Sequence, residues 1–199
     1  MATKYQLEEI RSQILLDLVP AYPTKFSEYE TSPCRGEVVF GSDHPPHPNL
    51  ILDLFVQCKV AFALPFAYYS VCVDGDPASL DTNIEGVDLP PDIQKTALRG
   101  QGQLKRDETQ LANKLAFREC SAWKCVGKSR SQVYDWIVPD VAVTNGILER
   151  EEFSGLGYCQ QCMQNFERAL SQAKEETWSN LPSYFALPPW DDAAYQSSP

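Results

Sequence analysis

The chain has 199 residues, of which 43% are hydrophobic, and it carries a formal net charge of −10. This length suits a single domain of ordinary size, and the apolar content predicts a globular fold. The acidic balance argues against a nucleic-acid surface or an anionic membrane as the partner, because both need clustered Lys and Arg side chains.

The sequence also argues against a membrane span and a secretory route. A span needs roughly 18 consecutive apolar residues, whereas the longest apolar region, 60–73, is interrupted by Pro65 and Ser70. Residues 1–6 show no signal-peptide pattern. The seven cysteines are an odd number, which favours a reducing compartment over a disulfide framework. We therefore expect a cytoplasmic or nuclear protein.

Apolar residues recur at helical spacing in several segments, and turn residues bound most of these segments. The predicted helical segments are 4–19, 25–30, 50–59, 65–73, 90–100, 104–120, 133–137 and 160–180. Asn49 is the predicted N-cap of the third segment, and Pro65 the first helical residue of the fourth. A helix break is predicted at Arg99-Gly100, and a helix stop at Leu181-Pro182.

Three stretches are predicted to lack regular structure. They are a proline-rich loop at 33–48, a loop at 121–131 and a frayed tail at 191–199. No segment shows the strong alternation of a strand. The sequence therefore predicts an all-α single domain over residues 1–199, an irregular helical bundle of about six to eight helices with long loops.

Four of the seven cysteines form two close pairs, Cys120-x4-Cys125 and Cys159-x2-Cys162. A tetrahedral thiolate site needs two short chelating pairs that bring sulfur atoms to about 2.3 Å from one zinc ion. The glycine turn before Cys159 would help both sulfurs of the second pair to point the same way. We predict a structural zinc site at Cys120, Cys125, Cys159 and Cys162. The alternative is that these are ordinary thiols that pack as small hydrophobic side chains.

The other candidate groups favour structural roles. Cys58 and Cys72 lie in apolar segments and are predicted to be core, while Cys34 is predicted to lie in a loop. His44 and His47 are the only histidines, in a proline-rich run that favours a surface loop over a metal site.

No assembled catalytic set is visible in the sequence. It contains no G-x-S-x-G, glycine-rich phosphate loop or HExxH motif, and its paired acids are typical of solvated surface. We therefore predict that the chain is not an enzyme. The alternative is a thiol-dependent redox protein or enzyme that uses Cys159 or Cys34, although the βαβ context of thioredoxin-like C-x2-C motifs is missing.

Aromatic side chains are dense on and after the last predicted helix; they are Trp178, Tyr184, Phe185 and Trp190. Such a density of aromatic residues could anchor a partner protein. We favour the interpretation that these side chains fold the terminal segment back onto the core.

Several motifs occur in an order that resembles a known family. They are residues 3–18 with Tyr22-Pro23, the stretch 64–69, Leu98-Arg99-Gly100, the Cys-x2-Cys helix entry, and Trp178-x2-Leu181-Pro182-x2-Phe185-x-Leu187-x2-Trp190. Together they resemble the region after the BTB/POZ fold in a large set of fungal BTB-domain proteins. The resemblance covers nearly the whole chain, although each motif alone is loose.

The resemblance implies a helical extension that follows a BTB/POZ domain, a domain type used for dimerisation and, in many relatives, for linking targets to cullin ubiquitin ligases. The chain begins at what resembles the last helix of the BTB fold or the point just after it, so it is expected to be either a truncated chain or a standalone derivative. Dimerisation and cullin binding, which use the BTB fold, are therefore not expected of this chain. The paired cysteines of the family map onto Cys120, Cys125, Cys159 and Cys162. We predict a non-enzymatic intracellular module that binds protein partners; a zinc-ribbon nucleic-acid binder is disfavoured by the acidic charge.

Overall fold

The computed structural model describes residues 13, 22–31, 47–73, 89–116, 137, 147–148 and 158–192. These ranges contain helices and no strand, which confirms the predicted all-α class for the described part of the chain. The elements are α2 (Phe26–Thr31), α3 (Pro48–Cys58), the 3-10 turn η2 (Ala61–Ala63), α4 (Leu64–Val73), α5 (Pro91–Ala116) and α7 (Gln160–Tyr184).

Several predicted elements fall outside the described residues. They are the helix at 4–19 apart from the helical Gln13, the loop at 33–46, the loop at 121–131, the segment 133–136 and the tail from 193 onward.

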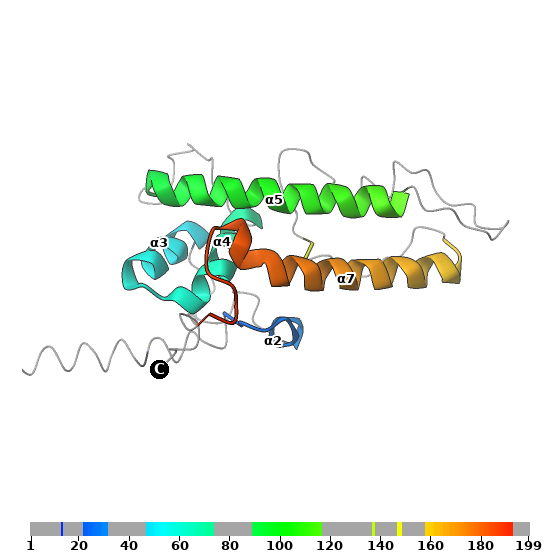
Figure 1. Ribbon diagram of the computed structural model, residues 1–199, viewed down its shortest axis with the longest axis horizontal. Coiled ribbons are helices and arrows are strands. Elements are labelled where there is room, and N and C mark those ends of the chain that lie inside the picture. The colour runs from blue at the N-terminus through cyan, green and yellow to red at the C-terminus, as the bar shows by residue number, and fades with distance from the viewer. Residues whose placement is uncertain are drawn as a thin grey trace, which may run out of the picture.

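The two long helices, α5 and α7, lie side by side and antiparallel, and the shorter helices gather at one end of this pair (Figure 1). Helix α5 buries a residue every three or four positions along one face, the spacing of an amphipathic helix. The buried residues of this face are Ile93, Ala97, Gly100, Leu104, Glu108, Leu111 and Leu115. The pair therefore forms the frame against which the remaining helices pack.

Helix α4 lies at the centre of the helix cluster and contacts α3, α5 and α7. Most of its side chains are buried, including Phe66, Tyr69, Val71 and Cys72. A helix that is apolar on all sides is stable in water only when other elements surround it. Helices α3 and α4 pack against each other, and α4 is largely buried, whereas α3 buries one face and exposes the other.

The aromatic residues at the end of α7 pack onto the core, as predicted. The ring of Trp178 stacks on Tyr29 of α2 at 5.1 Å between centroids and on Trp190 at 5.4 Å. It also contacts Phe66 of α4, and its indole nitrogen donates to the carbonyl oxygen of Thr24 at 3.4 Å. Trp178 therefore joins α2, α4 and the segment after α7 in one cluster.

The predicted helix break at Arg99-Gly100 is wrong, because α5 continues through both residues. Gly100 is buried against the ring of Phe185, and a Cβ there would lie 2.8 Å from Cζ and closer still to two other ring carbons. The glycine thus permits a close approach between helices. From sequence alone, it is indistinguishable from a glycine that ends a helix.

The predicted helix stop at Leu181-Pro182 is also wrong, since α7 runs to Tyr184 with Pro182 inside it. Proline has no N–H, so it cannot donate to the carbonyl oxygen four residues earlier, which belongs to Trp178. The indole nitrogen of Trp190 donates to that oxygen instead, at 2.8 Å. A bond from outside the helix therefore replaces the one that proline removes.

Helix α3 begins at Pro48, and its N-cap is His47 rather than the predicted Asn49. The Nδ1 atom of His47 accepts a hydrogen bond from the backbone N–H of Asn49 at 3.2 Å. This bond satisfies one of the N–H groups that have no partner at the start of a helix. His47 therefore has a structural role at a helix end, whereas His44 lies outside the described residues.

Substitution of Gly100 by Ala should destabilise the protein by about 1–3 kcal/mol, the usual cost of overpacking a core. Phe185 cannot easily move aside, because it is buried and stacks on Tyr68 at 4.9 Å. Gly102→Ala is the matched control, since a Cβ there meets nothing within 4 Å. It should stabilise the helix by about 0.5–1 kcal/mol. Thermal unfolding followed by circular dichroism would measure both, and a stabilising Gly100→Ala would contradict the close contact.

Trp190→Phe should destabilise the protein by about 1–3 kcal/mol, because it leaves the carbonyl oxygen of Trp178 without its donor while keeping an aromatic ring. Pro182→Ala restores a backbone N–H that can reach this oxygen. In the Pro182→Ala background the cost of Trp190→Phe should therefore shrink, and a double-mutant cycle of unfolding free energies would measure the difference. If Trp190→Phe lowers the unfolding free energy equally with Pro182 and with Ala at position 182, the indole bond does not replace the missing helix bond.

Candidate functional site

The predicted cysteine turn lies at the start of α7. Cys159 is the N-cap residue with extended backbone angles, and its carbonyl oxygen accepts from the N–H of Met163 at 3.0 Å. Cys162 lies three residues later, a spacing that places two side chains on neighbouring positions of one helix face. The prediction that this pair opens the last long helix is confirmed.

The two thiols differ in their surroundings. Cys159 is half-buried, whereas Cys162 is only 7% exposed and belongs to an apolar cluster that α5 and α7 share. Phe166 is in the same cluster, and Tyr158 packs against its ring edge-on at 4.9 Å. The pair therefore has one sulfur near the surface and one in the core.

The other half of the predicted zinc site, Cys120 and Cys125, lies outside the described residues. Within the part of the chain that the structure describes, no group of three or more His, Cys, Asp or Glu side chains is placed to hold a metal ion. Cys159 and Cys162 have the donor type and the spacing of half a tetrahedral thiolate site. The four-cysteine site stays a prediction.

Of the cysteines expected in the core, Cys72 is there and Cys58 is not. Cys72 is buried in α4, its thiol donates to the carbonyl oxygen of Ala97 at 3.4 Å, and burial raises its pKa to about 12. Cys58 is exposed at the end of α3, four residues after the exposed Leu54. It therefore lies on the outward face of its helix. Cys34 is outside the described residues.

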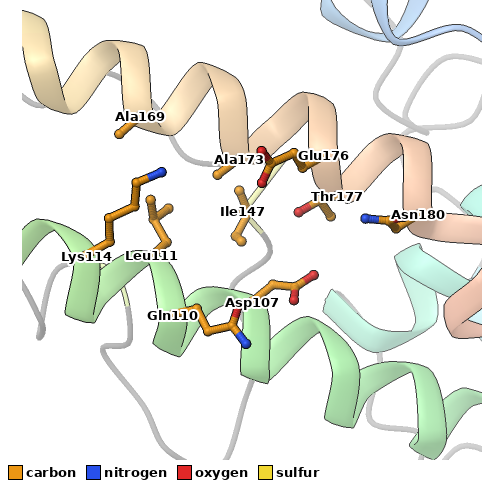
Figure 2. Close-up of a pocket in the computed structure, with 10 residues that line it drawn as sticks. All are labelled: Asp107, Gln110, Leu111, Lys114, Ile147, Ala169, Ala173, Glu176, Thr177 and Asn180. Atoms are coloured by element: carbon orange, nitrogen blue, oxygen red, sulfur yellow. The ribbon is translucent and has the colours of Figure 1, made fainter.

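A cleft between α5 and α7, with a volume of about 270 Å³, was not predicted from the sequence. Asp107 extends from α5 and the Thr177 hydroxyl from α7 into the same space, and Glu176 lies beside them (Figure 2). The apolar part of the lining includes Ile147 and Ala173. The cleft thus combines carboxylates, a hydroxyl and a small apolar wall.

The electrostatics of the cleft centre on Asp107. Burial raises the pKa of its carboxyl group, a hydrogen bond donated by the Tyr184 hydroxyl opposes this shift, and the negative charge of Glu176 adds to it. The pKa of Tyr184 is raised as well, by burial first and then by its bond to Asp107. Asp107 therefore favours the folded state most at acid pH, and this contribution is lost as the pH rises through its raised pKa.

Only α7 carries a polar interruption that coincides with this cleft. Its buried face is interrupted at Thr177, which lines the cleft, whereas Glu108, the polar residue on the buried face of α5, is not part of the lining. Polar residues in register with a buried face mark places where two helices do not meet through apolar packing alone.

Comparison of the chain with models of known protein families, with curated proteins and with solved structures found no match in any of the three. The resemblance to the region after a BTB/POZ fold therefore stays a prediction. Among the described helices, none combines the length and the apolar character that crossing a membrane requires.

Proposed function

We propose that the chain is a non-enzymatic intracellular module that binds a protein partner, an irregular bundle of about six to eight helices in the cytoplasm or nucleus. The outward face of α3 carries this proposal. Leu50 and Leu54 are 47% and 45% exposed, and they lie four residues apart on one side of the helix. Their placement agrees with the adaptor role that the BTB-type resemblance implies.

Helix α3 is held firmly enough to present these leucines in a fixed geometry. His47 caps its first turn, and Lys59 closes its last turn in a left-handed conformation with φ of 56°. The N–H of Lys59 donates to the carbonyl oxygen of Val56 at 3.2 Å. The opposite face is anchored by Leu52 and Phe55, which are buried in the core. A partner would therefore meet an ordered apolar surface and would lose little entropy in ordering it.

The contribution of Leu50 and Leu54 to the binding free energy can be estimated from their exposed area. Full burial of one leucine side chain contributes about 1.5–3 kcal/mol. Leu50 and Leu54 are each about half exposed, so completing the burial of both would contribute on the order of 1.5–3 kcal/mol together. This corresponds to roughly a tenfold to hundredfold change in affinity.

The double substitution Leu50→Gln with Leu54→Gln should lower partner binding by about tenfold or more, because it removes the apolar contact while keeping good helix formers. Leu98→Gln is the matched control, since Leu98 is 40% exposed on a different helix, α5. Affinity capture from extracts of the source cell, with quantitative mass spectrometry, would compare the variants with the unmodified chain. Identical partner sets for all three proteins, or no specific partner at all, would contradict the proposal.

We also propose that Cys120, Cys125, Cys159 and Cys162 hold a structural zinc ion. The support is the placement of Cys159 and Cys162 at the first turn of α7 together with the second close pair in the sequence. The site would fix the start of α7 relative to the segment around residues 120–125. Structural zinc contributes about 10–16 kcal/mol of binding free energy in small peptides, comparable to the whole stability of a domain.

Protein purified without chelators should contain about one zinc ion per chain, and Cys159→Ser should lose it. Cys58→Ser is the control, because Cys58 is an exposed thiol on α3. Alkylation of the native protein should modify Cys58 and spare Cys72, which is buried with a pKa raised to about 12. Metal analysis would measure the zinc content, and peptide mapping would show which cysteines are alkylated. A zinc-free protein in which Cys159 reacts faster than Cys58 would instead favour the thiol-dependent enzyme.

A further inference from the structure

The cleft between α5 and α7 contains two carboxylates that lack a cationic partner among the described residues. Asp107 accepts a hydrogen bond from Tyr184, and Glu176 accepts one from the side-chain amide of Gln172 at 2.7 Å. Both partners are neutral, and neither carboxylate forms an ion pair with a described cation; Asp107 is half-buried, whereas Glu176 is exposed. Lys114 lines the same cleft but lies seven residues from Asp107 on α5, which is about 10 Å along a helix.

Thr177 provides an independent sign that the cleft receives a ligand. The residue is 2% exposed, yet its hydroxyl makes no hydrogen bond with any described residue, and it points into the cleft (Figure 2). Threonine in a helix commonly bonds to the carbonyl oxygen four residues earlier. Thr96 and Thr109 do so here, at 2.9 and 2.8 Å. Thr177 differs from them and leaves its hydroxyl available to a molecule in the cleft.

We propose that this cleft binds a small organic cation with a primary ammonium group, held by Asp107, Glu176 and Thr177. A primary ammonium offers three N–H donors, which matches three oxygen acceptors from these side chains. A cation between the carboxylates also relieves the repulsion between them, and hydrogen bonds to charged groups are the stronger kind. The volume of about 270 Å³ suits a molecule of a few carbon atoms, below the usual range for drug-sized ligands.

The wall of the cleft would hold the alkyl part of the same ligand. Leu111 of α5 and Ala173 of α7 contribute to it, together with Ile147 from the segment between the helices. The small side chain of Ala173 leaves the space that a larger residue would fill. The apolar wall therefore favours an alkyl ammonium ion over a bare metal cation, because hard metal cations bind oxygen atoms and gain nothing from apolar side chains.

Isothermal titration of the full chain with n-butylammonium at low salt tests the proposal. We expect saturable binding of n-butylammonium, no binding of butyrate, and weaker binding of tetramethylammonium, which carries the charge but has no N–H donors. The comparison with tetramethylammonium distinguishes binding in the cleft from the general attraction of cations to an acidic protein. Absence of saturable binding by n-butylammonium, or equal binding of the three probes, would overturn the proposal.

Two substitutions locate the binding within the cleft. Thr177→Val keeps the shape but removes the hydroxyl, and it should weaken n-butylammonium binding about tenfold, while Glu176→Gln should weaken it about tenfold or more. Glu175→Gln is the matched control, because Glu175 and Glu176 are both exposed on α7 and carry the same charge, but only Glu176 lines the cleft. Unchanged thermal stability in circular dichroism confirms that the variants fold. If Glu175→Gln weakens binding as much as Glu176→Gln, the ligand does not occupy this cleft.

Discussion

The contact of Phe185 with the backbone of α5 at Gly100 sets the register of the two long helices. Since Gly100 has no side chain, the aromatic ring lies directly on the helix, and the same ring stacks on Tyr68 of α4 at 4.9 Å. The side chain of Phe185 thus contacts α4 and α5 and fixes the position of the end of α7 relative to both. The register also places Tyr184, the residue before Phe185, beside Asp107, two turns along α5 from Gly100. The cleft therefore depends on the same packing as the core.

The end of α7 shows how tertiary contacts support a segment whose local sequence opposes a helix. Pro182 removes one helix hydrogen bond, and Trp190, from beyond the helix, supplies a donor to the carbonyl oxygen of Trp178 that this leaves without a helix partner. The chain can bring Trp190 back because Ala186 adopts a left-handed conformation with φ of 54°, while Leu187 N–H donates to the carbonyl oxygen of Pro182 at 2.9 Å. Together with the bond from the N–H of Ala186 to the carbonyl oxygen of Ser183 at 3.2 Å, this bond forms the Schellman pattern that closes many helices. The stacked indole rings of Trp178 and Trp190 then hold the segment after the turn against α7.

The sequence predicted the class of fold and the presence of α2, α3, α4 and α7, because apolar periodicity is a local property that a single chain displays. It did not predict that Gly100 and Pro182 lie inside helices, since each is tolerated through a contact with a residue distant in sequence. The cysteine turn at Cys159 was found because its motif is contiguous. The acidic cleft was not, because Asp107 and Thr177 lie on different helices and meet only through the register of the pair.

The α5–α7 cleft lies between two separate clusters of buried apolar residues. Leu104 belongs to the cluster that contains α4, and Leu111 to the cluster that contains Cys162. Between them, ordinary packing would place large apolar side chains, yet α7 carries Ala173 and Thr177 and α5 carries Asp107. An unfilled space lined by apolar groups would be a simple packing defect. The ionised form of the half-buried Asp107 is disfavoured there by burial and by the nearby charge of Glu176. Local conflicts of this kind are typical of functional sites, where a ligand supplies the missing partner.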